Sequence, residues 1–321
     1  MTEGRIERWV RGPHVRLDLR SSVAVAAASS ATVKRRAVAA VQSGGARGAL
    51  VQRLLEVPFS ILPVSLLGRL PRLARTDGAG LAVSDDAAID ALTRADMALD
   101  GAVRDVVWLI PPPSDGARVS ALLLGDRSPI GHLRITDLAP TDRPRPGSST
   151  GTRSGVRWPV VIDTWEHDGV VVELTDAIDI GRSTPTHLDD EDLDALIADL
   201  QETLGEGPDG LVGAHGDLTP WNLRTTADGE QVLFDWEHRT FAPDGYDLVR
   251  YLLAGGDGPE RFARLPAERR RSCGPAIEAL LALADQRDAD RRVDELSDWK
   301  RADIAAERAA LNAMLDAARR A

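Results

Sequence analysis

The sequence predicts an α+β protein with two parts, a small antiparallel β-rich part followed by a larger, mainly helical part. Short apolar runs separated by turn residues fill 101–173, whereas apolar residues recur at helical spacing through 174–321. The chain has 321 residues, of which 43% are hydrophobic, and this is enough to form two cores. A divergent N-terminal extension over 1–100 is expected to precede these two parts.

The N-terminal extension is predicted to be helical and basic. Residues 31–57 carry apolar side chains at helical spacing, and a proline-punctuated apolar run follows over 58–70. Residues 1–76 contain 13 Lys and Arg against four acidic residues, although the whole chain has a net charge of −11. Two interpretations stay open. The extension packs on the rest of the protein as a cap, or its basic apolar surface makes weak peripheral contact with an anionic membrane.

Five short strands are predicted in the β-rich part, because each is an apolar run bounded by turn residues. They are Val106–Ile110, Val119–Leu124, Gly131–Thr136, Val160–Ile162 and Val170–Leu174. Twelve of the 19 residues from 137 to 155 are Pro, Gly, Ser or Thr. This composition predicts a mobile loop without a helix between the third and fourth strands.

Two helical regions are predicted after the strands. The first, 187–204, begins with the acidic run Asp189–Asp192 and continues with leucines at helical spacing. Carboxylates at a helix N-terminus complement the helix dipole, so this run is interpreted as a helix start rather than as a metal site. The second helical region, 275–321, is interrupted near 287–292.

One segment carries residues suited to chemistry. A His-Gly-Asp sequence ends at Asp217, Asn222 follows five positions later, and Asp235 follows after another 13 positions. The turn signal Asp228-Gly229 lies between Asn222 and Asp235 and predicts a hairpin. Such a hairpin can place Asn222 and Asp235 side by side as oxygen ligands, which Mg²⁺ prefers when it also holds phosphate oxygens. Asp217 is then available to accept or orient a hydroxyl proton, a division of roles that phosphoryl transfer needs.

The pattern HGDLTPWN followed by FDWE resembles the catalytic core of the aminoglycoside phosphotransferase and choline kinase family, relatives of protein kinases. The resemblance implies a bilobal protein-kinase-like fold, with the β-rich part as the N-lobe and the helical part as the C-lobe. It implies that Asp217 is the catalytic base and that Asn222 and Asp235 bind magnesium. It further implies that His215 supports the catalytic loop and that Asp247 braces it.

The β-rich part departs from this family where the nucleotide is bound. Kinase-like lobes carry a Lys on the third strand, paired with a Glu of the next helix. This chain has Arg134 on its third predicted strand, and 137–155 contains no Glu. Its only lysines are Lys34 and Lys300. Arg134 is therefore expected to contact phosphates in place of the lysine.

The connection between the two lobes is expected at Val170–Thr175. By the resemblance, backbone groups near Glu173 and Thr175 are available to pair with adenine. With Arg134, these residues form the nucleotide-binding set expected in the β-rich part.

Two functions of different classes follow. The leading one is ATP- and Mg²⁺-dependent transfer of the γ-phosphate to a hydroxyl of a small molecule. The alternative is a catalytically weak or inactive kinase-like protein that acts as a binding or assembly module. The intact Asp217, Asn222 and Asp235 favour the enzyme, whereas Arg134 and the missing Glu favour the module.

Composition excludes several other classes. The single cysteine, Cys273, excludes an intramolecular disulfide framework and fits a reducing cytoplasm. Stretches of about 18 uncharged apolar residues, as in a spanning helix, are absent from the sequence. An acidic body without a basic strand face argues against binding to nucleic acid.

Overall fold

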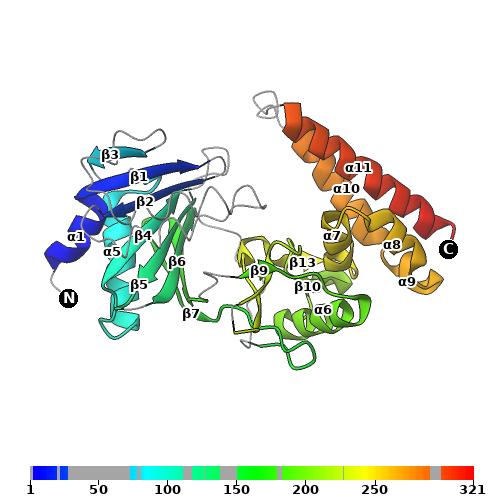
Figure 1. The fold of residues 1–321 in the computed structure, drawn as a ribbon, viewed down its shortest axis with the longest axis horizontal. Helices are drawn as coiled ribbons and strands as arrows, with labels where there is room; N and C mark the ends of the chain where they lie inside the picture. Colours follow the sequence, from blue (N-terminus) through cyan, green and yellow to red (C-terminus); the bar gives the residue numbers. More distant parts are fainter. Residues whose placement is uncertain are drawn as a thin grey trace. The chain divides into compact units, whose positions relative to one another are not determined.

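The chain forms two compact units, each with its own hydrophobic core (Figure 1). The computed structural model describes residues 3–19, 22–27, 73–77, 81–110, 118–126, 128–137, 150–178, 183–226, 228–289 and 298–321. One unit, here called the sheet unit, comprises Met1–Pro140 and Pro159–Gly181. The other, here called the helical unit, comprises Thr141–Trp158 and Arg182–Ala321.

One antiparallel sheet, with eight strands among the described residues, is the framework of the sheet unit. Its strands lie in the order β3-β1-β2-β4-β5-β6-β8-β7, so β8 separates β6 from β7. The strands are β1 Pro13–Leu19, β2 Ser22–Ala27, β3 Leu73–Asp77, β4 Asp105–Ile110, β5 Arg118–Leu124, β6 Pro129–Asp137, β7 Val161–His167 and β8 Val170–Asp176.

Two helices, α1 (Glu3–Arg11) and α5 (Asp85–Ala98), share a core with one face of this sheet. Alternate side chains of a strand point to opposite faces, and on β6 Leu133 and Ile135 point into the core. The face of α5 that packs against the sheet is rich in alanine, which lets the helix approach closely. Ser84 caps the start of α5 by accepting a hydrogen bond from the Ala87 N–H.

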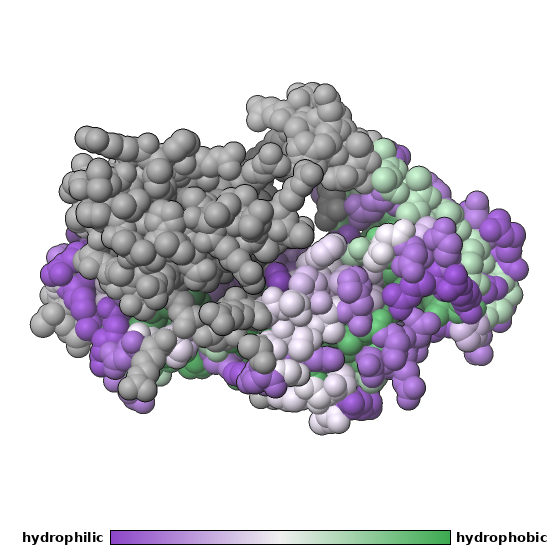
Figure 2. Space-filling model, in the orientation of Figure 1, coloured by the Kyte–Doolittle hydropathy of each residue, from purple (hydrophilic) through white to green (hydrophobic). Residues whose placement is uncertain are grey.

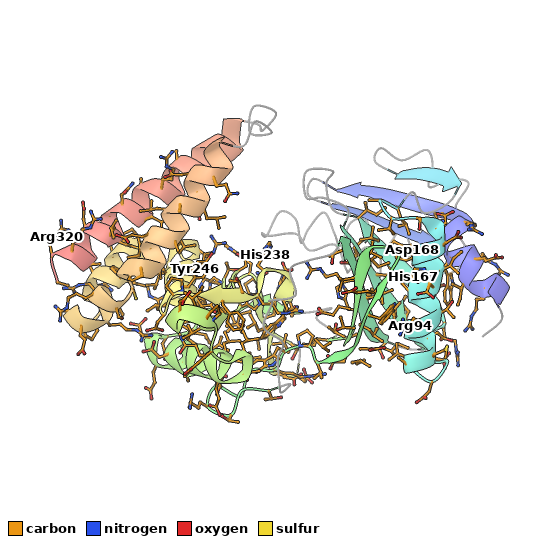
Figure 3. The ribbon with its side chains drawn as sticks, turned by 180° about the vertical axis from the view of Figure 1, so that it is seen from behind. Arg94, His167, Asp168, His238, Tyr246 and Arg320 are labelled. Carbon is orange, nitrogen blue, oxygen red and sulfur yellow. The ribbon has the colours of Figure 1, made fainter. Side chains whose placement is uncertain are left out.

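Polar and aromatic contacts attach α5 to the β7–β8 edge of the sheet. His167 Nδ1 lies 3.4 Å from an Asp90 carboxylate oxygen, and its Nε2 lies 3.4 Å from Asp168. The Arg94 guanidinium lies 4.8 Å from the ring centroid of Trp165. Figure 3 labels Arg94, His167 and Asp168 beside α5. The helix is therefore fixed to the last two strands as well as to β6.

The five predicted strands of the β-rich part are confirmed as β4, β5, β6, β7 and β8. The expected separate extension over 1–100 is corrected, because β1, β2 and β3 continue the same sheet and α5 covers it. β2 pairs directly with β4, which buries the edge that β4 would otherwise present. The predicted helix over 31–57 and the apolar run proposed for membrane contact lie outside the described residues.

The helical unit combines short strands with a set of helices. Its strands are β9 Thr184–Pro185, β10 Val212–Ala214, β11 Leu223–Thr225, β12 Gln231–Leu233 and β13 Thr240–Ala242. They form a β10–β13 pair and a β12-β11-β9 sheet. Its helices are α6 Asp190–Leu204, α7 Tyr246–Ala254, α8 Gly258–Arg264, α9 Ala267–Ser272, α10 Gly274–Ala289 and α11 Asp298–Arg319.

Both predicted helical regions are confirmed, as α6 and as the pair α10 and α11. Asp189 caps α6 by accepting a hydrogen bond of 2.9 Å from the Asp192 N–H, so the acidic run does begin a helix. The core of this unit joins Leu196 and Leu200 of α6 to Leu248 of α7 and Leu311 of α11. Figure 2 shows hydrophilic residues over α8 and α9, where arginines are frequent.

A buried carboxylate, Asp199 of α6, anchors the described end of the predicted loop 137–155. It accepts hydrogen bonds from the Ser154 N–H and hydroxyl at 2.8 and 2.7 Å. It also accepts bonds from the Arg153 N–H at 3.1 Å and the Thr152 hydroxyl at 3.3 Å. From residue 150 onward the segment is therefore fixed to α6, which corrects the expectation of a mobile loop there. Residues 138–149 lie outside the described residues.

Within the described ranges, none of the helices is both long and apolar enough to cross a membrane.

We expect stability to depend on the pH through Asp105, the first residue of β4. Burial raises the pKa of Asp105 to about 6, against a hydrogen bond from Val106 and the nearby Arg5. Since the unfolded state then loses its proton first, stability falls as the pH rises from about 4 to about 6. Asp105→Asn should remove this loss. Relative to the natural chain, its free energy of unfolding should rise by on the order of 1 kcal/mol between pH 4 and pH 6. Urea unfolding at both pH values measures this gain, and an equal difference at both values would contradict it.

Candidate active site

The loop from β10 to β11 carries the His-Gly-Asp sequence and reaches Asn222. Gly216 has a positive φ of 82°, and a Cβ at this position would collide with the His238 carbonyl. The 3₁₀ turn Trp236–His238, whose last residue is labelled in Figure 3, therefore packs directly on the loop. Only glycine satisfies both the conformation and the close approach at this position.

The buried carboxylate of Asp247 holds the loop through two backbone hydrogen bonds. Asp247, in the first turn of α7, accepts hydrogen bonds from the His215 N–H at 2.8 Å and the Gly216 N–H at 3.0 Å. Burial raises the pKa of Asp247 to about 6, although these two bonds act in the opposite direction. The loop backbone at 215–216 is thus fixed by the side chain expected to brace it.

His215 links the loop to the neighbouring hairpin. It is fully buried, and its Nε2 lies 3.0 Å from the Phe234 carbonyl oxygen. Its Nδ1 accepts a 3.3 Å hydrogen bond from the Asp217 N–H, so Nε2 carries the proton and donates it. Burial lowers the pKa of His215 to about 4, which keeps the ring neutral at pH 7. His215 therefore links the loop to the hairpin through these contacts.

Asp217 is held through both of its carboxylate oxygens. Oδ1 pairs with the guanidinium of Arg250 on α7, and Oδ2 accepts a 2.9 Å hydrogen bond from Asn222 Nδ2. Burial acts to raise the pKa of Asp217, but the charge and hydrogen bond of Arg250 outweigh it and lower that pKa. Asp217 is therefore a fixed carboxylate. Each oxygen can still accept a further hydrogen bond.

The amide of Asn222 is oriented by Asp217. Its Nδ2 donates to the Asp217 backbone carbonyl and to Asp217 Oδ2, both at 2.9 Å. Because both amide hydrogens face Asp217, the amide oxygen faces the other way. Asn222 thus presents a hard oxygen to its surroundings rather than a donor.

The hairpin β11–β12 brings Asp235 to the same end as Asn222. The Phe234 N–H donates a 3.0 Å hydrogen bond to the Asn222 carbonyl, which extends the ladder by one pair beyond Leu223 and Leu233. Asp235 follows at once, exposed and in the left-handed conformation with φ 65° and ψ 52°. A non-glycine residue in this region stores strain, a feature that concentrates at functional sites.

The donor set at this hairpin end fits Mg²⁺. A carboxylate of Asp235 and an amide oxygen of Asn222 are hard ligands, and Mg²⁺ uses few protein ligands when phosphates and water complete its shell. Among the described residues, groups of three or more His, Cys, Asp or Glu that could hold a metal by themselves are absent. The chemistry of the site therefore suits a metal that arrives with phosphates.

Three predicted nucleotide-binding residues lie in the sheet unit. Arg134 is buried on β6, on the face opposite to Leu133 and Ile135. It lies directly across from Ser120 on β5 and from Glu173 on β8. Directly opposed residues of antiparallel strands share a face. The sheet therefore places the carboxylate-bearing Glu173 next to Arg134.

The expected connection at Val170–Thr175 is corrected. This segment lies in β8, with β6 on one side and β7 on the other, so the backbone of Glu173 belongs to the sheet. Thr175 is also paired, and its hydroxyl lies 3.4 Å from the His132 carbonyl oxygen. Backbone groups in the middle of a sheet are already used, so Glu173 does not offer them to adenine.

Sequence reasoning missed Arg250 and Glu307. Arg250 Nη1 donates a 3.0 Å hydrogen bond to Glu307 Oε1 of α11, while its Nη2 pairs with Asp217. Arg250 follows Asp247 by three positions, one helical turn, so both point to the loop; this spacing was the available signal. Glu307 lies 57 positions further along the chain, where the sequence carries no sign of the contact.

The segment containing this site matches a known family. Residues 165–283 match the sequence model of the phosphotransferase enzyme family. This matched stretch, 165–283, is here called the phosphotransferase-family domain. The predicted resemblance to aminoglycoside phosphotransferases and choline kinases is thereby confirmed. No curated protein is significantly similar to the chain.

The phosphotransferase-family domain contains the loop, the hairpin and Asp247. It begins within β7 and ends within α10, so Arg134 and Glu307 both lie outside the matched segment. The similarity to the family thus covers Asp217, Asn222 and Asp235, whereas the arginine on β6 belongs to a part of the chain that the match does not reach.

Loss of the brace should destabilise the protein. Asp247→Ala leaves two buried backbone N–H groups without their acceptor, and we expect the free energy of unfolding to fall by about 2–4 kcal/mol. Asp244→Ala is the matched control, because Asp244 is exposed nearby and accepts a hydrogen bond from the Gln201 side chain rather than from buried backbone. Urea unfolding of the two variants should separate them, and equal midpoints would contradict the bracing role.

Loss of Arg250 should be still more costly than loss of its outer partner. Arg250→Met leaves the carboxylates of Asp217 and Glu307 without their shared cation, and we expect a loss of about 3–5 kcal/mol. Glu307→Gln keeps an acceptor for Arg250 and should cost about 1 kcal/mol. Chemical denaturation measures both values. If Arg250→Met is as stable as Glu307→Gln, the arginine does not neutralise this buried pair.

Proposed function

We propose that this protein transfers the γ-phosphate of ATP to a hydroxyl group of a small molecule. The observation that carries the proposal is the fixed Asp217 carboxylate beside Asn222, within the phosphotransferase-family domain and at the hairpin end that also carries Asp235. A positioned carboxylate next to hard oxygen ligands is the arrangement that phosphoryl transfer requires.

Asp217 would orient the acceptor. Its low pKa makes it a weak base, so its first role is to accept a hydrogen bond from the acceptor hydroxyl and to point that oxygen at the phosphorus. The hydroxyl oxygen forms the new bond to the γ-phosphorus, and the bond from that phosphorus to the bridging oxygen breaks. ADP leaves with the bonding electrons. The hydroxyl proton passes to Asp217 and then to water.

Asn222 and Asp235 would hold Mg²⁺, which supplies positive charge to the phosphate oxygens when bound. Arg250 keeps Asp217 in one orientation and ionised, and the Asn222 amide limits the remaining freedom of the carboxylate. Both partners act on the geometry of Asp217, which is where most of the catalytic advantage in phosphoryl transfer arises.

The sheet unit would contribute Arg134 to nucleotide binding, with Glu173 across the ladder as its charge partner. A buried guanidinium needs such a carboxylate, because a buried unpaired charge is costly. Support comes from the register of β6 and β8, which sets the two residues side by side. On this proposal Arg134→Ala weakens nucleotide binding.

A binding or assembly module without turnover is the second candidate. The observation that favours it is Arg134 on β6, where related kinases carry a lysine. Arginine and lysine bind phosphate with different geometry, so the replacement is not equivalent. The completeness of the loop favours the enzyme, because a module has no need of an oriented carboxylate at Asp217.

A substitution at Asp217 tests the leading function. In a phosphorylation screen of small hydroxyl-bearing metabolites and amino sugars with ATP and Mg²⁺, the natural chain should show turnover. Asp217→Asn keeps the shape but not the charge, and we expect turnover to fall by about a hundredfold or more while nucleotide affinity is retained. Asp228→Asn, in the exposed hairpin turn, is the control and should keep full activity. Nucleotide binding without turnover by the natural chain on any acceptor would favour the module instead.

A further inference from the structure

A second arginine lies beside the proposed metal ligands, within the helical unit. Arg224 is the middle residue of β11, directly after Leu223, and successive side chains of a strand point to opposite faces. Leu223 and Leu233 point into the core, so Arg224 lies on the other face, together with Phe234, whose N–H donates a hydrogen bond to the Asn222 carbonyl. Asp235 directly follows Phe234 in the chain.

The guanidinium of Arg224 is half-buried among neutral groups. It lies 5.9 Å from the ring centroid of Phe234, and its Nη1 lies 3.5 Å from the Ser183 carbonyl oxygen, a long and weak contact. Its Nε is buried without a hydrogen-bond partner. Arg224 forms no ion pair with a carboxylate of the described residues, and burial lowers the pKa of its guanidinium.

Two other partly buried arginines of the helical unit are paired with carboxylates. Arg250 pairs with Asp217 and Glu307, and Arg261 pairs with Asp190. A cation that is removed from water without an opposite charge raises the free energy of the fold. An anionic ligand at this face would supply the missing charge.

We propose that Arg224 binds a phosphate group of the nucleotide whose magnesium Asn222 and Asp235 hold. The guanidinium is planar and presents paired donors, which match two oxygens of a phosphate. Nη2 and the second N–H of Nη1 are the donors available for this contact, since Nε is buried and Nη1 uses one N–H toward the Ser183 carbonyl. The inference rests on the proposed function, because it takes the nucleotide as the source of the phosphate. It adds a phosphate contact from the helical unit itself to the one proposed for Arg134.

Binding measurements with fragments of the nucleotide test this assignment. Calorimetric titration with ATP, tripolyphosphate and adenosine, each with Mg²⁺, should be made on the natural chain and on Arg224→Gln. We expect the variant to bind ATP and tripolyphosphate about tenfold or more weakly and adenosine unchanged. Arg157→Gln is the control, because Arg157 borders the same hairpin but pairs with Glu230 at 3.8 Å. It should bind all three ligands like the natural chain.

The outcomes separate the inference from the proposed function. Equal ATP affinity of Arg224→Gln and the natural chain overturns the phosphate contact while leaving the proposed function in place. An equal loss for adenosine shows contact with the base and overturns the assignment too. If the natural chain binds neither ATP nor tripolyphosphate, both proposals fall. Arg224→Met, of similar length and suited to a half-buried position, repeats the comparison should Arg224→Gln not fold.

Discussion

The buried carboxylate of Asp247 is the interaction on which the arrangement of the site depends. It accepts hydrogen bonds from the N–H groups of His215 and Gly216 and so fixes the conformation of the backbone just before Asp217. His215 in turn donates a hydrogen bond to the Phe234 carbonyl, which connects the loop to the end of the hairpin. The loop and hairpin are thus one hydrogen-bonded body, and its rigidity follows from satisfying backbone groups that burial would otherwise leave unpaired.

Charge balance explains why the C-terminal helix belongs to this body. Asp247 is buried and Asp217 and Glu307 are partly buried around Arg250, which is the cation that offsets these carboxylates. α11 contributes the outer carboxylate, which keeps the guanidinium in place from the side away from Asp217. A residue outside the phosphotransferase-family segment therefore helps to fix the electrostatics of its central carboxylate.

The sequence was informative where local pattern determines structure. Alternation and turn residues located β4 to β8, and the spacing of Asp217, Asn222 and Asp235 located a site whose parts meet through one hairpin. It was uninformative where partners are remote. β2 pairs with β4 across more than 70 intervening residues. Glu173 lies opposite Arg134 because β8 pairs with β6, and Glu307 contacts Arg250 from a different helix. Such contacts are set by tertiary packing, which a single sequence does not encode in its periodicity.

The division of the chain between the two units has a consequence for how the protein is made. The polypeptide passes from one unit to the other three times, at residues 140–141, 158–159 and 181–182. A ribosome therefore releases Thr152–Ser154 long before Asp199, the carboxylate that holds them, has been synthesised. The sheet, by contrast, is complete once β8 has emerged. The order of synthesis thus favours formation of the sheet before the segment 141–158 has its partners in the helical unit. A single proteolytic cut between 141 and 181 would divide both units at once.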